Sequence, residues 1–170
     1  MAAVTYQGSG VVLSTDFIDC KWVGKTKGGQ AVTIELTNCI NMSNIDLTIA
    51  EKNDVVPSLT FTATYTNTDA MISDRTEPWK VTTADGITAG AGEILLNAGV
   101  FYVNNVAVAL TRGGGSFTVE RTFREINADD DMGPVKGRVV ITDSRASLTM
   151  NVLTFLTNLK NYWPAVTTTT

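Results

Sequence analysis

The sequence contains no histidine and carries little charge for its length. Histidine is the commonest general base, the usual partner of a nucleophilic serine or cysteine, and the commonest metal ligand. Its absence makes most familiar enzyme classes improbable. Charged residues make up 18% of the 170 residues, where about a quarter is typical of globular domains. This shortfall favours a surface that is partly covered by copies of the same chain.

Basic runs and long apolar runs are missing as well. The net charge is −4 and no basic stripe is available to neutralise phosphates, so tight nucleic-acid binding is not expected. No window approaches the ~18 apolar residues of a membrane span. The first ten residues lack a basic region followed by an apolar stretch, so we expect synthesis in a cytoplasm. Cys20 and Cys39 lack metal-binding spacing and are expected to be buried free thiols, with a disulfide as the alternative.

Alternating apolar and polar residues dominate the chain, and this period of two predicts β-strands. In residues 31–37, Val, Ile and Leu alternate with Thr and Glu, and in residues 59–66 apolar side chains alternate with threonines. Strands are predicted at residues 11–18, 20–24, 31–37, 45–49, 59–66, 100–110, 116–126, 135–142 and 146–152. Short strands at this spacing predict one mainly β domain, an antiparallel sandwich or barrel.

One short flanking α-helix is predicted at residues 155–163. Leu156, Leu159 and Trp163 fall on one stripe there, with Thr154 as the cap and Pro164 as the stop. Such a helix would cover a sheet edge or an open end of the sandwich. Flexible segments are predicted at residues 25–30, 67–76 and 82–92, and a flexible tail at residues 166–170.

Three features suggest chemical sites without completing them. The run TRGGGSF at residues 111–117 has three glycines but no GK[ST] ending, so a hairpin turn with a bulge is predicted. The run NADDDMG at residues 127–133 departs from a calcium loop, because its glycine comes one place late and Arg138 replaces the bidentate glutamate. Glu120, Glu125 and Asp143 are interpreted as surface carboxylates rather than as an acid and base pair. We therefore predict no catalytic residue, no metal site and no cofactor.

The second half of the chain carries four motifs in a recognisable order. They are the TRGG turn with Arg112, Gly113 and Gly114; the segment with Glu120, Arg121 and Phe123; the GPVKG loop at residues 133–137; and the NLK triplet at residues 158–160. In this order they resemble the amino-terminal half of the major tail tube proteins of long-tailed bacteriophages. Each motif is short, but four in the right order are fairly specific.

The first half resembles the carboxy-terminal half of the same family, which finishes near an EPW triplet, here residues 77–79. The halves therefore stand in the opposite order, and the resemblance implies a circular permutant. Residues 1–81 correspond to the second half, 82–92 to a joining linker, 93–165 to the first half and 166–170 to a tail. Permutation is tolerated at exposed loops when the original termini lie close together.

The resemblance implies a non-catalytic structural protein of the virion tail. Its copies would form hexameric rings that stack into a hollow tube, contact other tail proteins, and let DNA pass without specific binding. Assembly would take place in the host bacterial cytoplasm, with neither a membrane nor a small-molecule substrate as a partner. Loops with Asp74, Arg75, Asp129, Asp130 and Lys136 are predicted to make the subunit contacts, because long polar loops usually serve a function or are disordered.

A polar face with sparse acids is predicted to line the lumen, since it repels phosphate without gripping it. The residues are Thr33, Glu35, Thr37 and Asp46. Plain solvent exposure of this face is the alternative. Three other functions also stay open: a tube component of a phage-derived contractile injection apparatus, a β-sandwich binding module with exposed aromatics, and a hydrolase with converging carboxylates.

Overall fold

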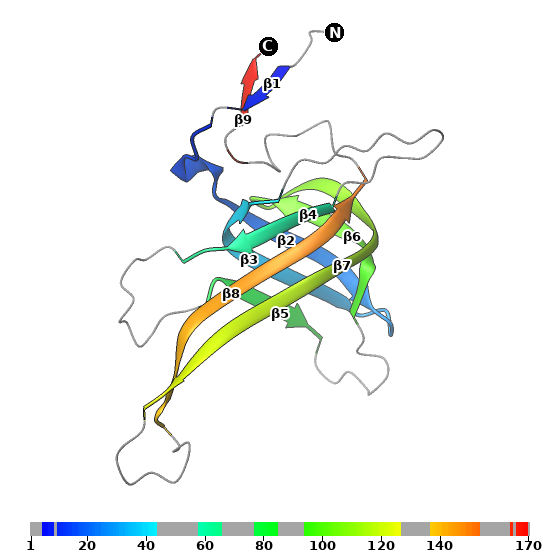
Figure 1. Cartoon of the computed structure of the whole chain (residues 1–170). Helices are drawn as coiled ribbons and strands as arrows, with labels where there is room; N and C mark the ends of the chain where they lie inside the picture. The colour runs from blue at the N-terminus through cyan, green and yellow to red at the C-terminus, as the bar shows by residue number, and fades with distance from the viewer. Residues whose placement is uncertain are drawn as a thin grey trace.

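The computed structural model describes residues 5–8, 10–43, 58–65, 77–84, 94–126, 137–153, 164 and 166–169; at residues 6, 94–98 and 166–169 it describes the backbone alone. The elements in these ranges are β1 (Thr5–Gly8), η1 (Ser14–Asp16), β2 (Ile18–Thr26), β3 (Ala31–Asn41), β4 (Ser58–Ala63), β5 (Trp79–Thr83), β6 (Ile94–Val103), β7 (Val106–Glu125), β8 (Val139–Val152) and β9 (Val166–Thr169). All their pairings are antiparallel (Figure 1). The predicted mainly β, antiparallel fold class is confirmed.

Six strands close into a barrel. They follow the order β2-β6-β7-β8-β4-β3, and β3 pairs back with β2, which completes the ring. β5 lies beside the first half of β3, and β4 pairs with the end of β3 at Cys39–Asn41. Closure leaves few open strand edges in the barrel, which protects it from unwanted pairing.

Trp22 fills the barrel interior between β2, β6 and β7. Its indole Nε1–H donates to Thr111 Oγ1 at 3.1 Å, and the Thr111 hydroxyl donates to the Gly99 carbonyl at 3.2 Å. A Cβ at Gly24 would lie 2.0 Å from the Trp22 ring, and one at Gly99 would lie 2.4 Å from Nε1. The two glycines are therefore required because the indole occupies the space of their side chains.

The predicted faces of β3 are confirmed, and those of β4 are confirmed except at Thr62, which is buried. Val32, Ile34 and Leu36 are buried on one side of β3, while the intervening threonines and glutamate reach the other side. Leu59 and Phe61 are buried in the same core, where Phe61 packs on Phe101 with ring centroids 5.1 Å apart. Period-two alternation thus predicted which side chains form the core.

The predicted strand at residues 11–18 is wrong. β2 begins at Ile18, and η1 precedes it. The Asp16 carboxylate accepts a hydrogen bond from the Leu13 N–H at 2.8 Å, and the Asp16 N–H donates to the Leu13 carbonyl at 3.0 Å. A short acidic side chain that satisfies a nearby backbone group competes with strand pairing, which explains the turn.

The predicted single strand at residues 100–110 is also wrong, because a hairpin divides it into β6 and β7. Asn104 and Asn105 have φ of 47° and 65°. Two residues with positive φ form the tight turn that matches the twist of paired strands, and asparagine tolerates this conformation. The Asn-Asn pair was the signal for this turn.

The predicted hairpin at residues 111–117 does not exist, although the bulge does. β7 runs through this segment, and its register with β8 moves from Thr111↔Val152 to Gly115↔Met150. Gly113 and Gly114 have φ of 71° and 83°, which glycine adopts at little cost. The Asn151 side-chain amide donates to the Gly113 carbonyl at 2.6 Å. The glycines therefore absorb extra residues inside a strand rather than reversing the chain.

Other boundaries differ from the sequence-based expectations. From Val139 on, the strands predicted at 135–142 and 146–152 form one strand, β8, and β5 was not predicted. Residues 25–30 form a turn in which the Thr26 N–H donates to the Gln30 carbonyl at 2.8 Å. The strand at 45–49 and the helix at 155–163 lie outside the described residues. β1 and β9 pair with each other, so the two ends of the chain lie together (Figure 1).

Candidate assembly surface

The two longest strands extend beyond the barrel as a two-stranded ribbon. β7 pairs with β6 only as far as Arg112, and β8 pairs with β4 only between Ser147 and Asn151. Within the described strands, residues 120–125 of β7 and 139–145 of β8 pair only with each other. We call this ribbon the arm, and Figure 1 shows it projecting from the lower end of the barrel.

The arm carries apolar side chains into solvent. Phe117 and Val119 pack against the core. Beyond Arg121 the register of β7 with β8 shifts between Thr122 and Phe123, and Phe123 lies opposite Ile141. Phe123 is 60% exposed and Ile141 is 49% exposed. Ile126, Val139 and Val140 are also exposed nearby. An isolated two-stranded ribbon is marginally stable in water, so an uncovered apolar face on one favours a partner.

Arg121 marks the boundary between barrel and arm. Its Nε donates to Glu77 Oε1 at 3.0 Å, and its Nη2 donates to Glu77 Oε2 at 2.7 Å. Its guanidinium also lies 5.8 Å from the Trp79 ring centroid, and Trp79 packs on Phe117 with centroids 5.6 Å apart. A bidentate ion pair holds two planar groups in one geometry. Glu77, Trp79, Phe117 and Arg121 together form what we call the clamp, which fixes the base of the arm to β5.

The clamp also sets the charge state of Glu77. The hydrogen bonds from Arg121 lower the pKa of the Glu77 carboxyl below its ordinary value, and the hydrogen bond from the Trp79 indole adds to this effect. Partial burial opposes the shift but does not cancel it. Glu77 therefore stays ionised, and its oxygens are occupied by structural hydrogen bonds.

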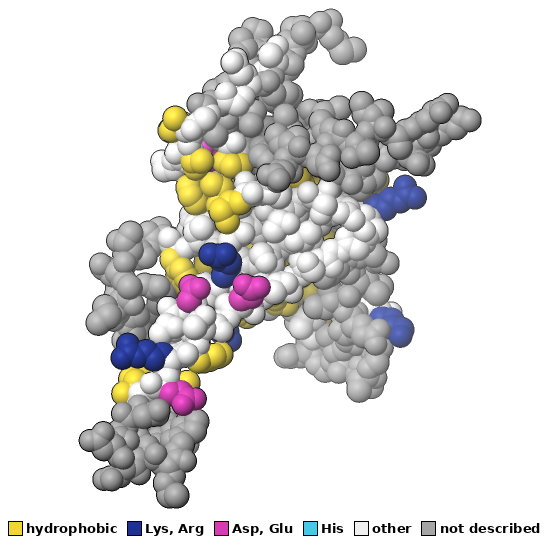
Figure 2. All heavy atoms as spheres, in the orientation of Figure 1, with side chains coloured by type: hydrophobic (Ala, Val, Ile, Leu, Met, Phe, Trp, Pro, Cys, Tyr) yellow, Lys and Arg dark blue, Asp and Glu magenta, His cyan; other side chains and the backbone are white. Residues whose placement is uncertain are grey.

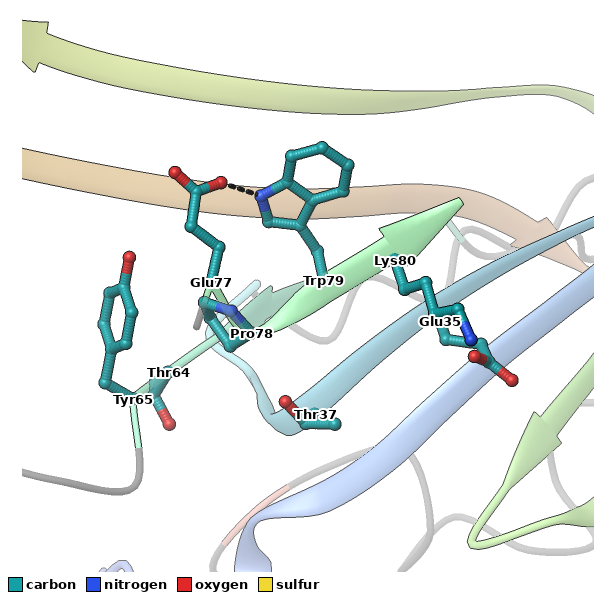
Figure 3. Close-up of a pocket in the computed structure, with 8 residues that line it drawn as sticks. All are labelled: Glu35, Thr37, Thr64, Tyr65, Glu77, Pro78, Trp79 and Lys80. Carbon is teal, nitrogen blue, oxygen red and sulfur yellow. Dashed lines mark hydrogen bonds between the residues drawn. The ribbon is translucent and has the colours of Figure 1, made fainter. Parts of the chain in front are cut away.

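A pocket of about 440 Å³ opens beside the clamp. It is lined by Glu35, Thr37, Thr64, Tyr65, Glu77, Pro78, Trp79 and Lys80 (Figure 3). In the close-up, Glu77 and Trp79 lie on one side, joined by the indole hydrogen bond, while Glu35 and Lys80 lie on the other. Arg121 hydrogen-bonds to Glu77 and lies over the Trp79 ring. This side of the pocket therefore belongs to the clamp, and the Glu77 carboxylate there already has a hydrogen-bond partner.

The residues predicted to line a lumen lie on the outer face of β3. Glu35 is half-buried between two lysines, since its register partners are Lys21 on β2 and Lys80 on β5. Thr33 and Thr37 lie on the same face. On this face Glu35 thus stands beside two lysines, of which Lys21 donates a hydrogen bond to the Asn105 side chain at 2.9 Å. Asp46 lies outside the described residues.

The other predicted site residues are dispersed. Asp74, Arg75, Asp129, Asp130 and Lys136 lie outside the described residues, as does the acidic run at 127–133. The carboxylates of Glu120, Glu125 and Asp143 lie at different register positions along the arm, and Glu120 faces Arg145 across the strands. Among the described residues, no group of three or more potential metal ligands is present.

No protein-family model, no curated protein and no solved structure matches this chain. Within the described ranges, no helix is long and apolar enough to span a membrane. The buried Cys20 and Cys39 are free thiols, as predicted. Burial raises the pKa of Cys20 well above its ordinary value, and the neighbouring Cys39 adds to the effect.

Sequence reasoning missed both the arm and the clamp. The signal for the arm was the apolar run Val139–Val140–Ile141, which departs from strict alternation in a strand that needs only one buried face. The clamp residues do stand in two of the motifs that suggested the resemblance, the EPW triplet and the segment with Arg121 and Phe123. Their contact joins residues 44 positions apart, which periodicity cannot reveal.

Proposed function

We propose that this chain is a structural subunit of a bacteriophage tail tube, in which copies assemble into rings that stack around a DNA-conducting lumen. The observation that carries the assembly part of this proposal is the arm. Its apolar side chains lie beyond Arg121 on strands that also build the core, and they are left uncovered in a single copy. The tail tube part rests on the four ordered motifs and on the EPW triplet.

The charge of the arm residues suits a reversible contact between copies. Arg124 and Glu125 of the arm, and Arg138 just before β8, are exposed among its apolar side chains. A protein with such a surface stays soluble as a monomer, and water is excluded from the surface when a partner covers it. The clamp supports the same role, because a ribbon fixed at its base loses less conformational freedom when it docks.

The face with Thr33, Glu35 and Thr37 stays the proposed lining of the lumen. Thr33 and Thr37 carry no charge, and the Glu35 carboxylate between them would repel phosphate. The variant Thr37→Cys tests this directly, because both native cysteines are buried. The new thiol should react with a bulky maleimide in the monomer and become protected in the tube. Equal labelling in both states would place this face on the outside.

Assembly itself is tested by microscopy and sedimentation across protein concentration. The wild-type chain is expected to form rings or hollow fibres at high concentration, and Phe123→Asp is expected to abolish them because it places a charge on the contact face. Thr118→Asp, an exposed change of the same charge on the barrel, is the control and should assemble normally. A wild-type chain that stays monomeric at every concentration would contradict the proposal.

A further inference from the structure

Two buried thiols lie close together where β2 begins. Figure 2 shows apolar side chains gathered at the upper left of the molecule, where Figure 1 places η1, and β2 follows directly after this segment. Unlike those exposed side chains, Cys20 of β2 is 1% exposed and Cys39 of β3 is fully buried. They are the only cysteines of the sequence, and both point into the core of the barrel. Neither takes part in the arm or in the clamp.

A β-bulge makes the two cysteines diagonal neighbours. β2 and β3 pair at Ile18↔Cys39 and next at Cys20↔Leu36. Between these two pairs β3 has two residues and β2 has one, which is a bulge in β3. Cys20 and Cys39 therefore stand one step apart along the strands, on the same side of the sheet. Side chains in such positions can reach each other across the strand pair.

The backbone beside both cysteines is held by hydrogen bonds between their neighbours. The Asp19 carboxylate accepts a hydrogen bond from the Asn38 N–H at 3.0 Å, which joins the residues that immediately precede the two cysteines. The Asp19 N–H donates to the Asn104 side chain at 3.0 Å, and the Asn104 N–H donates to the Asp19 carbonyl at 2.8 Å. These bonds hold the two strands together at this point, so the thiols stay within reach of each other.

The two thiols are in contact. Burial raises the pKa of the Cys20 thiol well above its ordinary value, and a hydrogen bond with the Cys39 side chain raises it further. Such a bond requires the two side chains to face each other inside the core. A protonated thiol is a poor nucleophile, so the pair stays reduced while the barrel is closed and no strong oxidant is present.

We propose that Cys20 and Cys39 form a reversible disulfide when a peroxide oxidises the folded chain, and that this bond fastens β2 to β3. The pairing of these two strands is the one that completes the barrel, so the bond would fasten the ring where it closes. It forms within one chain, whether or not copies assemble, and so does not depend on the proposed function. In a reducing cytoplasm the pair stays as thiols, and it becomes a disulfide under oxidising conditions.

The oxidation takes place in two steps. The sulfur of one thiolate attacks a peroxide oxygen and the O–O bond breaks. The leaving hydroxide takes up the proton that the thiol had lost, which gives a sulfenic acid and one water. The sulfur of the second thiol then attacks the sulfenic sulfur, so that the S–S bond forms and the S–O bond breaks. The hydroxide leaves with the proton of the second thiol as a second water. Two thiols are thus oxidised and one peroxide is reduced.

Hydrogen peroxide treatment of the folded, monomeric protein tests this inference. After treatment, alkylation in denaturant should find no free thiol, and peptide mass spectrometry should find the Cys20 peptide joined to the Cys39 peptide. The midpoint of thermal unfolding should rise by about 5–10 °C, because the bond constrains the unfolded chain across residues 20–39. Dithiothreitol should reverse the rise. Since peroxide also oxidises methionine, only the part of the shift that dithiothreitol removes is assigned to the disulfide.

Cys39→Ala is the matched control. It leaves Cys20 as a single buried thiol, so peroxide should cause no rise in the melting midpoint that dithiothreitol reverses. Circular dichroism establishes that the variant is folded. The comparison of the oxidised wild type before and after reduction needs no variant, so it tests the bond even if Cys39→Ala does not fold.

Three results would overturn the inference. Thiols that stay free under a peroxide exposure that fully oxidises the unfolded chain would show that the sulfur atoms do not meet in the folded barrel. Disulfides between two chains would show that the cysteines react only after the barrel has opened. An intramolecular bond that lowers the melting midpoint, or leaves it unchanged, would show strain rather than a fastening of β2 to β3. None of these results bears on assembly, so the proposed function would stand.

Discussion

β7 and β8 run through both the barrel and the arm, but their apolar residues are buried in the barrel and exposed in the arm. Within the barrel, Leu148 and Met150 of β8 are almost fully buried. A few residues earlier along the same strand, Val140 and Ile141 are more than 40% exposed. Burial inside one chain stabilises the fold, whereas apolar area left in solvent stabilises only a complex. The strand thus divides, near the clamp, into a part that folds the subunit and a part that we propose assembles it.

The largest expected contrast lies within β8. Leu148→Ala should lower the free energy of unfolding by about 2–5 kcal/mol, because it opens a cavity in the closed core. Ile141→Ala should change it by about 0.5 kcal/mol or less, since that side chain is half in solvent. Urea unfolding at a concentration where the protein is monomeric measures both. Equal losses would mean that the arm is packed within the single chain, and the contrast would fail.

A smaller effect tests the packing inside the barrel. Gly99→Ala should cost about 1–3 kcal/mol, because the added Cβ would overlap the Trp22 indole. In a Trp22→Leu background the same change should cost less, since the ring is gone. A double-mutant cycle from denaturant unfolding gives the coupling between the two positions. Additive losses would show that the close approach of Gly99 and Trp22 does not limit the packing.

The clamp should make part of the stability depend on pH. Because the folded pKa of Glu77 is lowered, its contribution is complete above the pKa of the unfolded chain and is lost as the pH falls through the folded value. Wild type should therefore be more stable than Glu77→Gln at pH 7, and the difference should shrink towards pH 3. Urea unfolding at several pH values measures it. Glu125→Gln, which removes an exposed carboxylate at the end of the arm, is the control. A difference that is constant with pH would contradict the clamp.

The smallest expected effect is a difference in thiol reactivity between the barrel and the arm. Cys20 and Cys39 are buried, and the raised pKa of Cys20 keeps its thiol protonated, so neither should react with Ellman's reagent at pH 8 until the protein unfolds. Val140→Cys places a thiol in the arm and should react at once. The stability that the neutral Cys20 contributes should be complete below the unfolded pKa near 9.0 and decline as the pH rises further. Rapid labelling of the native cysteines would mean that the barrel opens readily.

Local patterns predicted the parts of the fold that depend on neighbouring residues. The alternation in residues 31–37 predicted the buried and outer faces of β3, and the run at 59–66 predicted the buried Leu59 and Phe61 of β4 but not the burial of Thr62. The same reasoning failed where a polar side chain or a pair of asparagines redirected the chain, as at Asp16 and at Asn104–Asn105. In both places turn chemistry acts over two to four residues and overrides the longer alternating pattern.

The candidate surface needed information that no local pattern contains. Arg121 reads as an exposed strand residue, and only the pairing of β5 with β3 brings Glu77 within reach of it. The exposure of Phe123 likewise depends on where β4 and β6 stop, not on its own segment. The three glycines at 113–115 are typical of a turn. In the structure they lie inside β7, where its register with β8 shifts.

By itself, the sequence determined that this protein is mainly β and which face of β3 is buried, and it favoured two buried free thiols over a disulfide. These properties follow from a period of two along the strand and from the character of each side chain. Only the tertiary structure decided that the strands close into a barrel, that β7 and β8 extend past it, and that the clamp joins residues 44 positions apart. Pairing and strand ends are relations between distant segments, and they are fixed by the free energy of the whole fold rather than by any one segment.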